Sequence, residues 1–173
     1  MVQKAFKLGA APAHNEVIMN ELSDLLAPDA ILARLPATSR RQALQAMTDV
    51  LAKSAGIDAR AAFEAVLMRE RLSGTGMGDG VAIPHAPVAG IARPIGGFAR
   101  LETPQDFDAL DSRPADLVFM LLAPPDRGGD HLKALARVSR LLRRPDMREK
   151  LRAARSAEEI ASLLAGAVRV DAA

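Results

Sequence analysis

The sequence contains no cysteine, tryptophan or tyrosine, and five phenylalanines are its only aromatic side chains. The missing cysteines exclude disulfides, thiolate ligands for zinc or iron–sulfur clusters, and a cysteine nucleophile. The formal net charge is only +2, whereas single-stranded nucleic acid is bound by a basic groove with aromatic side chains on which the bases stack. The composition therefore argues against a nucleic-acid-binding protein.

Long hydrophobic runs are also missing. The longest uninterrupted apolar stretch is 117–123, far short of the roughly 20 residues that a membrane-spanning helix needs. Residues 1–18 lack the sustained apolar segment of a secretory signal peptide. We therefore expect a cytoplasmic protein with no membrane insertion.

The rest of the composition is typical of one folded domain. Hydrophobic residues make up 49% and charged residues 25% of the 173-residue chain, which is enough for one ordinary core. No repeat, low-complexity linker or long charge block divides the chain after Met19. We expect a flexible N-terminal arm over residues 1–18 and a single domain over 19–169, with Met19 as an alternative start.

The spacing of apolar residues predicts strands interleaved with helices. Short apolar runs predict strands at 30–35, 81–83, 95–101 and 117–123. Helical periodicity, capping residues and glycine stops predict helices between Ser39 and Gly56, from Asp58 to about Arg71, from Asp130 to about Arg143, from Asp146 onward, and between Ser156 and Gly166. The run at 117–123 is apolar on both faces, as in a central strand covered by helices on each side. These features predict an α/β layered domain.

The sequence has only three histidines, His14, His85 and His131. His14 lies in the predicted arm. His85 follows a short predicted strand and Pro84, so the chain presents its ring at a strand end on a rigid backbone. Two interpretations fit His85: a structural residue hydrogen-bonded to the backbone, or a catalytic imidazole.

His131 falls in the first turn of a predicted helix whose expected N-cap is Asp130. A helix N-terminus offers unpaired N–H groups and a partial positive charge, both of which attract an anion. His131 therefore either donates a hydrogen bond to a bound phosphoryl group or simply supports the helix cap.

A glycine-dense loop, 73–80, precedes His85. It lacks the Gly-Lys-Ser/Thr of a P-loop and the offsets of a dinucleotide fingerprint, which argues against ATP or NAD. Its backbone can approach an anion closely, with Ser73, Gly74, Thr75 and Gly76 as candidate phosphate contacts. A plain turn explains the glycines equally well. With two histidines outside the arm and no cysteine, we expect no metal site.

Four arginines, Arg137, Arg140, Arg144 and Arg148, recur at helical spacing near the C-terminus. Such a stripe is either a solvated helix face or a docking surface for an acidic partner.

Residues 69–85, RERLSGTGMGDGVAIPH, resemble the active-site signature of enzyme IIA domains in the fructose/mannitol/nitrogen-regulatory class of the phosphoenolpyruvate-dependent phosphotransferase system. The resemblance continues through 101–124 and 130–135 and spans roughly 21–164. The central stretch is most similar to the nitrogen-regulatory branch. Two departures stand out: Asp79 replaces a common asparagine and brings a negative charge to the loop, and Ala86 replaces a frequent glycine.

The resemblance implies a type-2 EIIA domain over 19–169, in which a mixed β-sheet is sandwiched between helices. It implies that His85 accepts a phosphoryl group on Nε2 from an HPr-like histidine phosphocarrier protein of the nitrogen branch. Arg69 then corresponds to the arginine that faces the phosphoryl group, and His131 to the second active-site histidine. For Nε2 to attack, Nδ1 has to carry the proton, which a backbone carbonyl can accept. No cofactor is implied.

Three functions stay open at this point. The first is a phosphocarrier that regulates partner proteins through its phosphorylation state. The second is a sugar-specific enzyme IIA that passes the phosphoryl group to a IIB domain. The third is a binding module that has kept the fold without transferring phosphate. Intact His85, Arg69 and His131 argue against the third.

Overall fold

The computed structural model describes residues 22–166. The predicted arm 1–18, His14, Met19 and the domain's last residues 167–169 lie outside this range. The described elements are, in order, β1 (Leu26–Leu35), α1 (Arg40–Ala55), α2 (Ala59–Leu72), β2 (Gly76–Gly78), β3 (Val81–Ala82), β4 (His85–Pro87), β5 (Ile95–Gln105), β6 (Ala115–Ala123), α3 (Gly128–Leu142), α4 (Pro145–Ala153) and α5 (Ala157–Ala165).

The six described strands form one mixed sheet. Its order is β1-β5-β6-β3-β2, and β4 also pairs with β6. β1 and β5 are parallel, β5 and β6 antiparallel, and β3 and β4 both parallel to β6. β6 therefore lies at the centre of the sheet, as its two-sided apolar run predicts.

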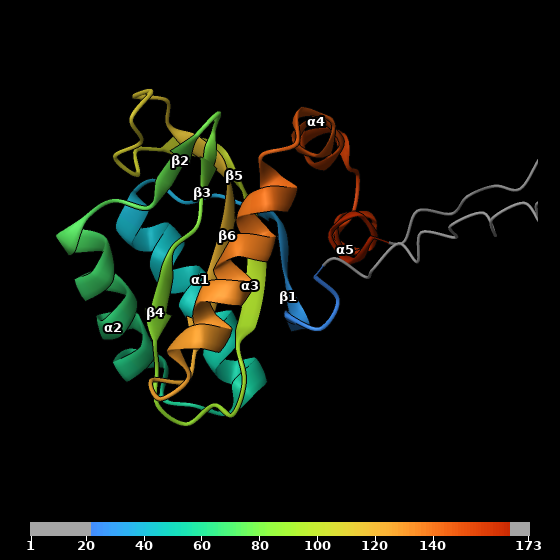
Figure 1. Ribbon diagram of the computed structural model, residues 1–173. Coiled ribbons are helices and arrows are strands. Elements are labelled where there is room, and N and C mark those ends of the chain that lie inside the picture. Colours follow the sequence, from blue (N-terminus) through green and yellow to red (C-terminus); the bar gives the residue numbers. More distant parts are fainter. Residues whose placement is uncertain (1–21, 167–173) are drawn as a thin grey trace, which may run out of the picture.

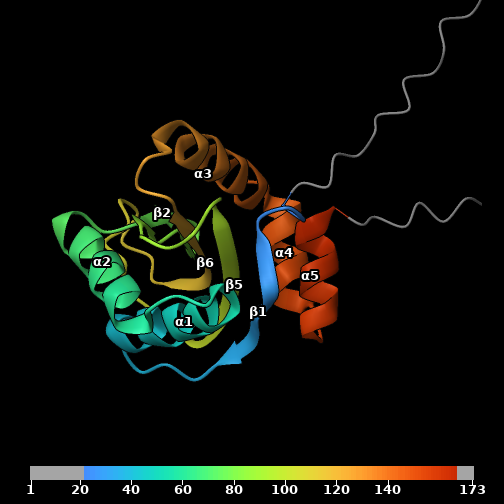
Figure 2. The ribbon, with the colours of Figure 1, turned by 90° about the horizontal axis from the view of Figure 1, so that it is seen from below.

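Helices cover both faces of the sheet. Figure 2 shows α1 and α2 on one side and α3 on the other, with α4 and α5 beside β1. Side chains of β6 alternate between two cores: Val118, Met120 and Leu122 pack toward α1 and α2, whereas Leu117, Phe119 and Leu121 pack toward α3. This alternation is the two-residue period of a strand. It confirms the predicted α/β layered fold.

The predicted caps of α1 and α5 are present, and Asp58, the predicted first residue of α2, is its N-cap. Ser39 accepts a hydrogen bond from the Gln42 N–H, and Gly56 closes α1 in the left-handed region. At α5, Ser156 accepts a hydrogen bond from the Glu159 N–H, and Gly166 closes the helix in the left-handed region. At α2 the Asp58 carboxylate accepts from two backbone N–H groups of the first turn.

The predicted start of α3 at Asp130 is wrong. The helix begins at Gly128, with Arg127 as its N-cap, and Asp130 is its third residue. Asp130 lies 3.7 Å from Arg127 in an ion pair. An acidic side chain is stabilising anywhere in the first turn, because the helix dipole is positive there. An aspartate at this place therefore indicates the first turn of a helix, but it does not show which residue is the N-cap.

His85 follows the end of the short strand β3, as predicted, and itself begins a further strand, β4. β3 and β4 pair with β6 in one continuous register, Ala82 with Val118 and His85 with Leu121. Pro84 lies between them and has no N–H to donate, although its carbonyl still accepts from Leu121 at 2.9 Å. The proline interrupts the strand, and the pairing resumes at His85.

Candidate functional site

His85 is the first residue of β4, the strand that runs between α2 and α3 in Figure 1. Nδ1 is 2.8 Å from the Ile83 carbonyl oxygen. A carbonyl oxygen only accepts, so Nδ1 carries the proton and donates it. Nε2 consequently keeps its lone pair, as nucleophilic attack requires. The interaction with a backbone carbonyl is the one expected from the sequence.

His131 lies against His85. The two ring centroids are 5.4 Å apart and the planes meet edge to face at 78°. The Nε2 atom of His131 is buried and has no hydrogen-bond partner among the described residues. Its backbone N–H already donates to Arg127, so the ring is the group that can contact an anion. A buried nitrogen without a partner is costly, which makes this atom a candidate ligand contact.

Both imidazoles are held neutral. Burial has the largest effect and lowers the pKa of His85. The hydrogen bond to the Ile83 carbonyl raises the pKa, the positive charge of Arg69 lowers it, and the Glu70 carboxylate raises it by the smallest amount. Burial also lowers the pKa of His131, with a second contribution from His85. Since the ordinary imidazole value is 6.5, the neutral forms dominate at pH 7.

A cavity of about 210 Å³ opens beside the His85 ring. Its lining residues come from α2, the glycine loop, the β3–β4 segment and α3: Arg69, Thr75, Gly76, Met77, Ile83, His85, Leu135, Ser139 and Arg143. Arg69 lies in the last turn of α2 and donates to the Ser73 carbonyl oxygen at 2.7 Å. The fold thus brings Arg69, His85 and, through the ring contact, His131 to one place.

Residues 24–167 match the family described as "Phosphoenolpyruvate-dependent sugar phosphotransferase system, EIIA 2". The chain belongs to this family.

Individual relatives agree with this assignment. The chain is 51% identical over 144 residues to the nitrogen regulatory protein of Bradyrhizobium diazoefficiens, covering 83% of this chain and 94% of that protein. It is 36% identical over 151 residues to a fructose-specific EIIA component of Haloferax volcanii, covering 87% and 98%. The nitrogen regulatory protein IIA-Ntr of Neisseria meningitidis has a similar structure, with a TM-score of 0.77 at 32% identity over 83% of this chain and 98% of that one. The predicted fold and the resemblance to the nitrogen-regulatory branch are confirmed.

The glycine loop of this EIIA domain has its own internal partners. The Thr75 N–H donates to Glu70 and the Gly76 N–H to the Phe107 carbonyl oxygen. A Cβ at Gly76 would lie 2.8 Å from the Ala109 Cβ, so the loop packs too closely on the β5–β6 connection for larger residues. Two amides of the predicted phosphate loop are therefore committed to protein acceptors. For Ser73 and Gly74, phosphate contact stays a prediction.

The negative charge of Asp79 does not face His85. Asp79 is in the left-handed region at the tip of the β2–β3 turn, and its carboxylate lies 3.6 Å from Arg113 and 3.7 Å from Arg148. It lines a different cavity, which shares no residue with the one at His85. The negative charge that Asp79 brings to the loop therefore lies outside the cavity at His85. Ala86 is fully buried beneath α2, within the core.

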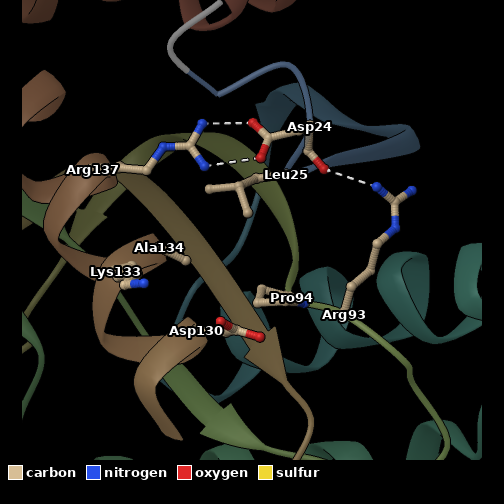
Figure 3. Close-up of a pocket in the computed structure, with 8 residues that line it drawn as sticks. All are labelled: Asp24, Leu25, Arg93, Pro94, Asp130, Lys133, Ala134 and Arg137. Atoms are coloured by element: carbon tan, nitrogen blue, oxygen red, sulfur yellow. Dashed lines mark hydrogen bonds and ion pairs between the residues drawn. The ribbon is translucent and has the colours of Figure 1, made fainter. Parts of the chain in front are cut away.

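Three of the four arginines predicted to form a basic stripe, Arg137, Arg144 and Arg148, are individually paired. Arg137 donates to both carboxylate oxygens of Asp24, at 2.5 and 2.9 Å, beside a cavity of about 230 Å³. Figure 3 shows this pair. Hydrogen bonding to Arg137 lowers the pKa of Asp24. Arg144 pairs with Asp146 at 2.9 Å, and Arg148 donates to main-chain carbonyls. Internal pairing favours the solvated-face interpretation of the stripe.

Sequence reasoning did not identify Glu70, Ser139 or Arg143. The signal for the last two was present, because His131, Leu135, Ser139 and Arg143 follow one another at i+4 intervals along α3 and share a helix face. Within residues 22–166, no cluster of three or more acidic or histidine side chains could hold a metal ion. None of the described helices has the length and apolarity to cross a membrane.

Proposed function

We propose that this protein is a cytoplasmic phosphocarrier of a nitrogen-regulatory phosphotransferase chain. His85 Nε2 accepts a phosphoryl group from a phosphohistidine on an HPr-like carrier protein, and the phosphorylation state regulates partner proteins. One observation carries the proposal: His85, with its tautomer set by the Ile83 carbonyl, adjoins a buried His131 Nε2 that has no partner among residues 22–166. Once phosphorus is bonded to His85 Nε2, an oxygen of the phosphoryl group would give His131 Nε2 a hydrogen-bond acceptor.

The transfer exchanges one nitrogen–phosphorus bond for another. The bond from phosphorus to the donor's histidine breaks while the bond to His85 Nε2 forms, so donor and product are phosphoramidates of similar energy. Nδ1 keeps its proton, and the Ile83 carbonyl stabilises the positive charge that develops on the His85 ring. Since the transition state is loose, catalysis consists mainly of positioning and charge neutralisation. The Arg69 guanidinium supplies a permanent charge and planar donors for the equatorial oxygens.

Exposed apolar side chains around the site support docking of a protein donor. Met68 and Leu72 on α2 are 68% and 80% exposed and flank Arg69, whereas Leu132 on α3 is 69% exposed and follows His131. Large apolar residues exposed beside a polar centre are typical of a protein-binding surface. The donor covers these residues while its phosphohistidine reaches the cavity.

The regulatory output follows from charge. A phosphoryl group adds nearly two negative charges at neutral pH to a surface where the free protein presents neutral imidazoles and Arg69. A partner whose contact surface complements one charge state then binds it selectively.

The first experiment incubates the full chain with phosphoenolpyruvate and the upstream phosphotransferases. We expect the native protein to take up one phosphoryl group and His85→Ala to take up none. Label retained by His85→Ala would refute the assignment of His85. Absence of label on the native protein would favour the binding module that does not transfer phosphate. Affinity capture with the phosphorylated protein and with His85→Ala then compares the partners of the two states.

A second candidate is a sugar-specific enzyme IIA that passes the phosphoryl group to a IIB domain. It is favoured by the 36% identity to a fructose-specific EIIA component. Rapid transfer from phosphorylated His85 to a purified fructose IIB domain would support this candidate. Stable phosphoprotein in the presence of IIB domains would support the regulatory one.

A further inference from the structure

Glu70 is a buried carboxylate that the proposed reaction does not use. It lies on α2 next to Arg69, and its side chain is only 2% exposed. One carboxylate oxygen accepts from the Thr75 N–H at 3.0 Å and the other from the Thr75 hydroxyl at 2.6 Å. Arg40 approaches the same carboxylate to 3.6 Å. Burying a charge is costly without such partners, so the arrangement calls for a functional explanation.

Hydrogen bonds connect Glu70 to the His85 ring in three steps. Glu70 holds both the N–H and the hydroxyl of Thr75. The Thr75 carbonyl oxygen accepts from the Ile83 N–H at 3.0 Å. The Ile83 carbonyl oxygen in turn accepts the proton on His85 Nδ1 at 2.8 Å. The position of the group that sets the His85 tautomer therefore depends on where Glu70 holds the loop.

We propose that Glu70 is the positioning residue of His85: through Thr75 and Ile83 it keeps the imidazole oriented with Nδ1 protonated. The electrostatics support this role, because Glu70 raises the pKa of His85 while Arg69 lowers it. The other ionisable groups facing the site are His131 and Arg143. Glu70 thus opposes part of the effect that the Arg69 guanidinium has on the pKa of His85.

The test uses Glu70→Gln in the full chain, because glutamine keeps an acceptor for the Thr75 N–H and removes the charge. Glu64→Gln is the matched control: Glu64 lies on the same helix, is 64% exposed and pairs with Arg60. Nitrogen chemical shifts of His85 followed through a pH titration give its pKa and tautomer without any phosphotransfer. Initial rates with the phosphorylated carrier give kcat and KM; only this readout rests on the proposed function.

We expect Glu70→Gln to lower the pKa of His85 and to reduce kcat roughly tenfold, less than the ~100-fold cost of a 1 Å misplacement. KM for the carrier stays unchanged, because Glu70 is buried beneath the docking surface. Glu64→Gln changes none of these quantities. A Glu70→Gln protein with native titration and tautomer overturns the proposal, whatever its rate. If neither protein accepts phosphate but the titrations differ, the positioning role stands and the proposed function fails.

A second pair of variants decides the matter if Glu70→Gln does not fold. Thr75→Val removes the hydroxyl that donates to Glu70, and Thr75→Ser retains it. We expect the valine variant to lose more of the Nδ1-protonated tautomer than the serine variant. Equal tautomer populations in the two would contradict the proposal.

Discussion

Two of the cavities lined by arginine differ in what their polar groups contact. The larger, about 470 Å³, is lined by Arg113, Arg148 and Arg152, and these arginines meet carboxylates or main-chain carbonyls. The smaller, about 210 Å³, lies at His85, beside a buried His131 nitrogen with no partner in the described chain.

The comparison indicates that volume and positive charge do not distinguish the proposed reactive site from other cavities. In the larger cavity Arg152 holds both oxygens of Asp116 at 2.9 Å and also the Asp79 carbonyl. Such pairing connects the β2–β3 turn to α4. In the smaller cavity, nitrogen atoms retain unused hydrogen-bonding capacity, which a phosphoryl group can use. The first cavity stabilises the fold, and the second is suited to chemistry.

The largest effect expected from this comparison concerns Arg69. We expect Arg69→Ala to slow phosphoryl transfer to His85 by about 100-fold, the typical cost of removing a donor aimed at developing charge. The Tm of this variant stays close to that of the native protein, because the hydrogen bond that Arg69 donates to the Ser73 carbonyl oxygen is exposed. Stopped-flow or quench kinetics with the phosphorylated carrier measure the rate. An unchanged rate would remove Arg69 from the site.

The reverse pattern is expected at the larger cavity. Asp116→Asn weakens the paired contact with Arg152 and destabilises the protein by about 1–2 kcal/mol, as for a charged hydrogen bond that is partly exposed. This corresponds to a fall in Tm of roughly 2–8 °C in a chain of this size. Phosphoryl transfer stays native. A transfer defect in Asp116→Asn without loss of stability would abolish the distinction between the two cavities.

The smallest effect concerns pH. Burial lowers the pKa of His85, so the neutral, nucleophilic ring persists below the pH at which an exposed imidazole takes up its proton. We expect kcat/KM for transfer to be flat from pH 8 to 6.5 and to decline only below 6.5, provided that the donor is assayed at saturating phosphorylation. The lowered pKa values of the two histidines also make the folded protein less stable as pH falls below 6.5, because the unfolded chain then binds more protons than the folded one. A midpoint for transfer at or above 6.5 would contradict the burial of the ring.

Much of the fold was predictable because its signals are local. The two-sided apolar run of β6 and the caps of α1, α2 and α5 each depend on residues adjacent in sequence. The start of α3 was misplaced because Asp130 suits the third position of a helix as well as its cap.

The site was predictable in part. The glycine loop, Pro84 and His85 are contiguous, and together they form a specific pattern. The role of Glu70 depends instead on the parallel register of β3 and β4 against β6 and on Thr75 returning to α2. Neither contact leaves a signal in one sequence. The partners of Asp79 likewise come from α4 and the β5–β6 connection, far along the chain.

The most direct measurement is a long-range proton–nitrogen NMR spectrum of the full chain after phosphorylation by phosphoenolpyruvate and the upstream proteins. The account predicts a single phosphohistidine, with phosphorus bonded to Nε2 of His85, Nδ1 still protonated, and His131 unmodified. Phosphorus on Nδ1 of His85, or on His131, would contradict it.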